Sequence, residues 1–77
     1  MKYSIVIEKA EHNYAAYSPD VDGCVATGDT IESVKQQIAE ALEFHFEGLL
    51  MDKDPIPSAR TIVDYVEVNV PTNVPQL

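Results

Sequence analysis

The chain has 77 residues, 13 of them acidic and five basic, which gives a formal net charge of −8. A fold of this length is one domain with a thin core, since it buries only about 60% of the surface that its unfolded chain exposes. A single cysteine excludes an internal disulfide and a Cys-rich zinc site, and the acidic charge argues against binding to phosphate backbones.

The N-terminal part of the sequence predicts three short strands. Three segments have the alternation or the composition of strands: residues 2–9, 14–17 and 24–27. Turn-forming residues separate them: Asn13, Pro19-Asp20 and Asp22-Gly23. In the first segment, Tyr3, Ile5 and Ile7 share the face that we assign to the core. These strands should form an antiparallel meander.

After residue 28 the spacing of the apolar residues changes from that of a strand to that of a helix, and this pattern predicts a helix that ends by Met51. Either Asp29 or Thr30 can cap its start, and Asp29 with Glu32 has the spacing of a capping box. Apolar positions recur at helical spacing along one side. This side carries Ile31, Val34, Ile38, Leu42 and Leu49, together with Ala41 and His45. The helix therefore has one face to bury against the sheet.

Residues 61–70 alternate again and predict a fourth strand, after a loop at residues 52–57. A crossover helix makes the third and fourth strands parallel. The fold class is therefore α+β with element order β-β-β-α-β. With the last strand beside the first, the mixed four-stranded sheet has the order 3-2-1-4 and carries one helix on one face. The domain spans residues 1–70, and residues 71–77 are expected to form a mobile C-terminal tail.

One helix covers one face of such a sheet, so the other face should remain open for association. Val6, Ala15, Tyr17, Val25 and Tyr65 fall on this open face in one register. Domains this small usually gain stability from disulfides, a metal or a partner chain. We expect a homo-oligomer, either a dimer or a tetramer, that associates through the last strand, the open face or both.

A run of turn and capping residues lies between positions 17 and 32. It contains Pro19-Asp20, Gly23-Cys24 and Gly28-Asp29-Thr30. In this order and spacing, the run resembles the HicB family of bacterial and archaeal antitoxins. The similarity continues at residues 41–43, 46–50 and 54–57 and covers residues 2–70. The turn and capping residues in this run also have ordinary structural roles. We expect Cys24 to be a small buried apolar residue.

The resemblance implies a partial ribonuclease H-like fold and a partner, a small basic HicA-type toxin that cleaves messenger RNA. The antitoxin would bind this toxin and block its RNA-facing surface, and a charge of −8 suits a basic partner. Many family members carry a C-terminal DNA-binding domain. No basic recognition helix follows residue 70 here, so we expect no direct DNA binding. With neither an export signal nor a membrane span in the sequence, we expect a cytoplasmic location.

Five residues are candidates for the contact with a toxin: Glu8, Glu11, Tyr17, Asp20 and Asp22. The acids would form ion pairs with basic side chains of the toxin, and Tyr17 would be an apolar anchor. We predict no enzyme activity, no metal site and no cofactor. The core-facing positions of the first strand carry no acid for a two-metal nuclease site, and no serine has the context of a nucleophile elbow.

Two other functions stay open at this point. The chain could be an orphan homo-oligomeric HicB-like domain that has no toxin partner. It could also be a weak RNA-binding module that stacks bases on Tyr14, Tyr17 and Tyr65, although five basic residues give it little attraction for phosphate.

Overall fold

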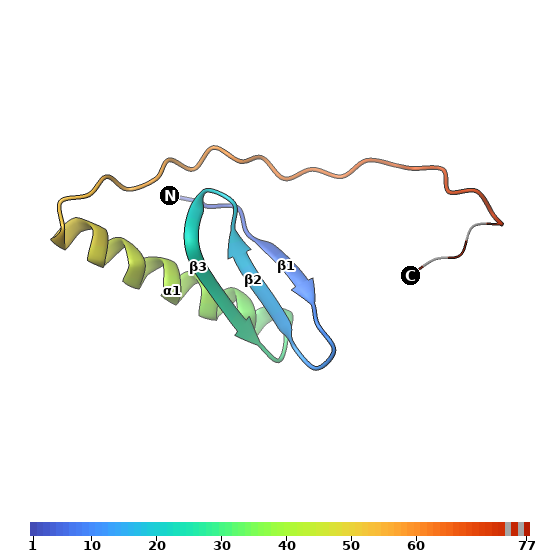
Figure 1. The fold of residues 1–77 in the computed structure, drawn as a ribbon, viewed down its shortest axis with the longest axis horizontal. Coiled ribbons are helices and arrows are strands. Elements are labelled where there is room, and N and C mark those ends of the chain that lie inside the picture. Colours follow the sequence, from blue (N-terminus) through green and yellow to red (C-terminus); the bar gives the residue numbers. More distant parts are fainter. Residues whose placement is uncertain (74, 76) are drawn as a thin grey trace.

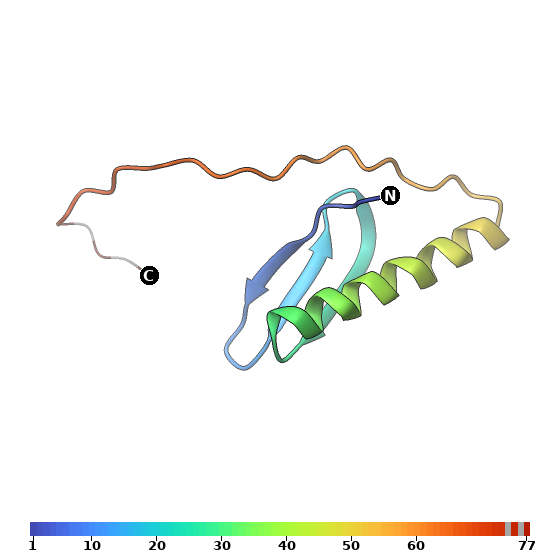
Figure 2. The same cartoon turned by 180° about the vertical axis from the view of Figure 1, so that it is seen from behind.

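Three antiparallel strands carry one long helix on a single face (Figures 1 and 2). The computed structural model describes residues 1–73, 75 and 77. The elements are β1 (Val6–Lys9), β2 (Tyr14–Ser18), β3 (Val21–Gly28) and α1 (Ile31–Met51). The strand order is β1-β2-β3, so β1 and β3 are the edges of this sheet. The predicted α+β class, with three strands followed by a helix, is confirmed.

Two strand boundaries differ from the prediction. β1 begins at Val6, opposite Tyr17, and residues 2–5 lie outside the β1–β2 ladder, although the Ser18 hydroxyl donates to the Ser4 carbonyl at 2.8 Å. β3 begins at Val21, so the turn predicted at Asp22-Gly23 lies inside the strand. The ladder register shifts between Tyr17 and Ser18, and Gly23 has a φ of 77°. Such a shift is typical of a β-bulge, where glycine takes the positive φ without strain.

Helix α1 has the predicted bounds but a different cap. The Thr30 hydroxyl accepts the Ser33 N–H at 3.0 Å, and the Ser33 hydroxyl accepts the Thr30 N–H at 3.0 Å. The capping box therefore joins Thr30 and Ser33, and the box predicted between Asp29 and Glu32 is wrong. A short Ser side chain reaches back to the cap as well as a Glu side chain does.

The helix ends in a Schellman motif. Lys53 has a φ of 59°, and its N–H donates to the Leu50 carbonyl at 3.1 Å. The Asp54 N–H donates to the Leu49 carbonyl at 2.8 Å. These two bonds satisfy carbonyls that the last helical turn leaves free, and Pro55 then prevents the helix from continuing.

The core lies between α1 and the inner face of the sheet. Its buried members are Ala16, Val21, Cys24, Val34, Ile38 and Leu42. Tyr3, Ile5 and Ile7 pack against this cluster, which confirms their predicted orientation. The C-terminal part of α1 projects past the sheet (Figure 2). Leu50 and Met51 are therefore 64% and 84% exposed.

Residues 61–70 do not form the predicted fourth strand in this sheet, and the order 3-2-1-4 is not observed. The segment is extended, as its alternation predicts, but it runs away from the sheet (Figure 1). Alternation predicts an extended backbone and does not select the strand that pairs with it. The partial ribonuclease H-like fold, which includes that strand, is therefore not confirmed. The predicted tail at residues 71–77 includes residues 74 and 76, which lie outside the described residues.

Candidate protein-interaction site

The face of the sheet opposite α1 is uncovered. Two cross-strand rows form it, and we call it the open sheet face: Val6, Tyr17 and Val25 in one row, Glu8, Ala15 and Thr27 in the next. Tyr17 is 41% exposed and Val25 is 65% exposed. The predicted orientation of the strand residues on this face is confirmed, whereas Tyr65 lies outside the sheet.

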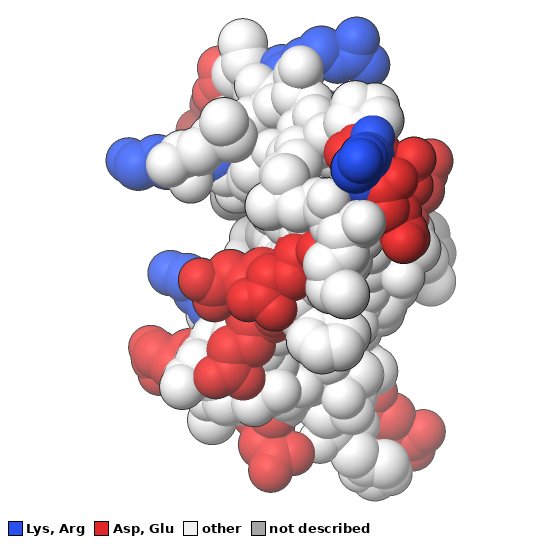
Figure 3. Space-filling model, turned by 90° about the vertical axis from the view of Figure 1, so that its left-hand side faces the viewer, with Lys and Arg blue, Asp and Glu red and all other residues white. Residues whose placement is uncertain are grey.

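The four acids among the five predicted partner-facing residues lie toward two ends of the sheet. Glu8 is in β1 and Glu11 is in the β1–β2 turn, whereas Asp20 is in the β2–β3 turn and Asp22 is the second residue of β3. Tyr17 is between them on the open sheet face. Among described residues, no group of three or more His, Cys, Asp or Glu side chains is arranged to hold a metal ion. On the side shown in Figure 3, the acidic side chains likewise form several separate patches.

Asp20 differs from the other acids because its carboxylate is engaged within the chain. Oδ2 accepts the backbone N–H groups of Arg60 and Thr61, both at 2.9 Å, and Oδ1 accepts the Thr61 hydroxyl at 2.7 Å. The Thr61 N–H and hydroxyl, followed by the Arg60 N–H and charge, lower the pKa of Asp20 below its ordinary value of 3.8. Asp20 thus anchors the start of the extended segment, a contact between distant residues that no local sequence pattern indicates.

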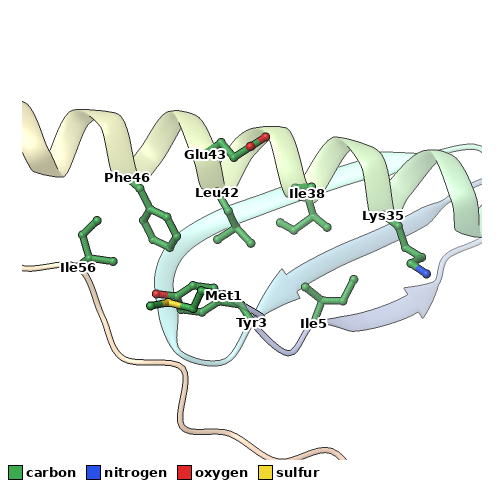
Figure 4. Close-up of a pocket in the computed structure, with 10 residues that line it drawn as sticks. Met1, Tyr3, Ile5, Lys35, Ile38, Leu42, Glu43, Phe46 and Ile56 are labelled. Atoms are coloured by element: carbon green, nitrogen blue, oxygen red, sulfur yellow. The ribbon is translucent and has the colours of Figure 1, made fainter.

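An apolar groove lies between α1 and residues 1–5, which lead into β1 (Figure 4). Its volume is about 510 Å³. It is lined by Met1, Tyr3, Ile5, Lys35, Ile38, Ala39, Leu42, Glu43, Phe46 and Ile56, and we call it the β1 groove. The rings of Tyr3 and Phe46 form one end of it, with centroids 5.1 Å apart. Sequence analysis missed this groove, because it depends on how far the helix axis lies from the edge of the sheet.

A second depression, of about 410 Å³, lies between β3 and the C-terminal half of α1. Cys24 and His45 both line it. Burial raises the pKa of the Cys24 thiol, which keeps the thiol protonated near neutral pH and makes it a poor nucleophile. Cys24 is also a member of the buried core, as predicted for a small apolar residue. No helix within the described residues has both the length and the apolar content to cross a bilayer.

Comparisons with known proteins agree with one another. The family model for the HicB-like antitoxin of bacterial toxin–antitoxin systems matches residues 3–72. A 14.9 kDa protein from the rep–hol intergenic region of Haemophilus phage HP1 is 39% identical over 66 residues; the match covers 86% of this chain and 50% of the relative. The chain thus spans half the length of that relative.

Two further similarities cover more of the matched protein. A UPF0150 protein of Synechocystis sp. is 35% identical over 69 residues, which cover 88% of this chain and 87% of the relative. Among solved structures, a chain from a structure described as the HicA3 and HicB3 toxin–antitoxin complex matches with a TM-score of 0.68 and 33% identity. That match covers 78% of this chain and 70% of the other.

Proposed function

The chain belongs to the HicB-like antitoxin family, and on that premise we propose that it binds and neutralises a small basic toxin of the HicA type. The likeness to a chain of the HicA3–HicB3 complex carries the proposal. The chain would act as a binding protein in the cytoplasm, without catalysis and without a cofactor. It would inhibit the toxin by covering the surface that receives messenger RNA.

The charge and the open sheet face support this function. A net charge of −8 attracts a basic partner and accelerates its association. The open sheet face offers Tyr17 as a half-exposed aromatic anchor, with Glu8 in the adjacent row. Glu11 and Asp22 are exposed at the two ends of the sheet and would pair with basic side chains at the rim of the interface. Asp20 would contribute indirectly, by holding the start of the extended segment.

A pair of aromatic substitutions tests the assignment of this surface. Tyr17→Ala removes the anchor from the open sheet face, whereas Phe44→Ala removes a ring that is 77% exposed on α1. We expect Tyr17→Ala to weaken binding to a purified HicA-type toxin about 10-fold or more, the effect of losing an interface hot spot. Phe44→Ala should leave the affinity unchanged. Isothermal titration calorimetry measures both, and thermal melts confirm that both variants are folded.

The charge contribution and the inhibition itself need separate measurements. Glu8→Lys with Glu11→Lys should slow association and flatten its dependence on salt, since the rim charges act mainly on the association rate. Stoichiometric amounts of the native chain should stop the toxin from cleaving RNA. If RNA cleavage continues at full rate in the presence of excess chain, the proposal is wrong and an orphan domain becomes the better description.

A further inference from the structure

Residues 61–70, which we call the arm, form an extended segment with an exposed apolar side. On this side Ile62, Val66, Val68 and Val70 are 89%, 85%, 68% and 51% exposed, and Asp64 is the one charged residue among them. Among the described residues, none of the arm beyond Thr61 is hydrogen-bonded to the sheet. Such a run of β-branched residues has the composition of a β-strand but is not paired with one. Extended segments of this kind commonly add to the edge of another sheet.

The sheet has a free edge that suits the arm. β1 pairs with β2 on one side only, so the outer N–H and C=O groups of β1 are available. The β1 groove adjoins the start of this edge, since Tyr3 and Ile5 line it just before β1 begins and α1 packs mainly against β3 and β2. Ile5, Ile38 and Leu42 face the groove (Figure 4). A strand added to β1 would place every second side chain over these residues.

The path of the chain directs the arm away from its own groove. The Tyr3 hydroxyl donates to the Pro57 carbonyl at 2.6 Å, and Asp20 holds Arg60 and Thr61 at the β2–β3 turn. From there the arm leaves the body of the molecule and diverges from β1, as both views of the ribbon show (Figures 1 and 2). The groove and the arm of one chain are therefore complementary in chemistry but separated in space.

The exposed area of the chain points to the same arrangement. A compact monomer of 8.5 kDa exposes about 4,650 Å² by the scaling of folded proteins. This chain exposes 6706 Å². The excess of about 2,000 Å² is more than the roughly 800 Å² that each partner buries in a standard interface.

We infer that two copies of this chain exchange arms. The arm of each copy adds to the β1 edge of the other as a fourth strand, and its Ile62, Val66, Val68 and Val70 side closes the partner's β1 groove. The exchange is reciprocal, so both edges and both grooves are used in a closed two-fold dimer. This inference does not depend on toxin binding, because it uses the groove and the arm and leaves the open sheet face free.

Two neighbouring substitutions test the exchange in the full chain. Val68→Lys and Asn69→Lys each add one positive charge, but they lie on opposite sides of an extended strand. The native chain and Asn69→Lys should have about twice the 8.5 kDa mass of one chain in light scattering at micromolar concentration. Val68→Lys should have the mass of a monomer. Equal masses for the two variants, or a monomeric native protein, would overturn the inference.

A second measurement on the native chain decides which molecule supplies the arm. A mixture of isotope-labelled and unlabelled chains should give intermolecular nuclear Overhauser effects between Val66 or Val68 methyl groups and Ile5, Leu42 or Phe46. Contacts of the arm with its own groove, or of one arm with another arm, would contradict the exchange. Neither result bears on the toxin-binding test, so the two proposals fail independently.

Discussion

Asp20 sets the direction in which the arm leaves the domain. Its carboxylate accepts three hydrogen bonds from Arg60 and Thr61, and all three favour the ionised form. The pKa of Asp20 is accordingly lowered from 3.8. A carboxyl with a lowered pKa in the anchored state stabilises that state at pH values above its ordinary pKa, and this stabilisation is lost as the pH falls through the lowered pKa. The anchor should therefore be intact at neutral pH.

The titration of this anchor is measurable. The amide resonances of Arg60 and Thr61 should be constant from pH 7 to about pH 5 and should move only in the acid range below 3.8, together with the Asp20 carboxyl. In Asp20→Ala these amides should have the shifts of an unanchored segment already at pH 7. Asp22→Ala, which alters an exposed neighbour, serves as the control and should preserve the native titration. If the Thr61 amide shift changes neither with pH nor in Asp20→Ala, the hydrogen bonds between Asp20 and the extended segment do not exist in solution.

At the scale of elements, the junction between β3 and α1 depends on the glycine at position 28 and on the capping box at the start of α1. A Cβ atom on Gly28 would lie 2.6 Å from the Val34 backbone nitrogen, so only glycine permits the corner at its present tightness. The Thr30–Ser33 capping box then satisfies free N–H groups in the first turn of α1. Together they place α1 close to β3, where Val34 is fully buried. The position of the β1 groove follows from this placement.

The structure and the sequence-based prediction disagree about the cap, which makes a direct test possible. Thr30→Ala should lower the free energy of unfolding by about 1 kcal/mol, the usual effect of removing an N-cap side chain. Asp29→Ala should lower it by less than half as much, since Asp29 is exposed and precedes the cap. Urea denaturation at equal protein concentration compares the two variants. A larger effect for Asp29→Ala would favour the box with Glu32.

At the scale of the whole molecule, the chain is long and has a large surface for its mass. Its principal extents are 55 × 27 × 18 Å, and the arm accounts for the longest of them. Among the described residues, only six apolar side chains are buried, a thin core even for a domain of this size. Such a chain gains stability when its exposed apolar side chains meet a partner, because each buried side chain of this size contributes about 1.5–3 kcal/mol.

The thermal stability of the native chain should therefore depend on its concentration. A tenfold increase in concentration favours a dimer by about 1.4 kcal/mol. Since about 1 kcal/mol moves the Tm of a domain this size by about 4–8 °C, we expect the Tm to rise by a few degrees. Val68→Lys should show the same Tm at every concentration. Differential scanning calorimetry provides the comparison, and a concentration-independent native Tm would argue for a self-sufficient monomer.

Local patterns in the sequence determined most elements of this protein. Helical spacing predicted a helix capped at Asp29 or Thr30 and ended by Met51, and α1 is Ile31–Met51. Alternation assigned Ile5 and Ile7 to the core and Tyr17 and Val25 to the open sheet face, where they lie. These assignments succeeded because the side chains on one face of a strand or a helix recur at a fixed spacing, and the apolar residues of the sequence recur at the same spacing. The motif around Gly23-Cys24 and Gly28-Asp29-Thr30 also indicated the family that the comparisons show.

Only the tertiary structure decided which distant segments meet. Residues 61–70 have the pattern of a strand, yet their partner depends on the path of the loop before them and on the anchor at Asp20. The β1 groove likewise exists because α1 lies over β2 and β3 and leaves the β1 side uncovered. Periodicity in a sequence describes neighbours along the chain, whereas strand pairing, anchors and grooves depend on distances in space between residues far apart in that chain.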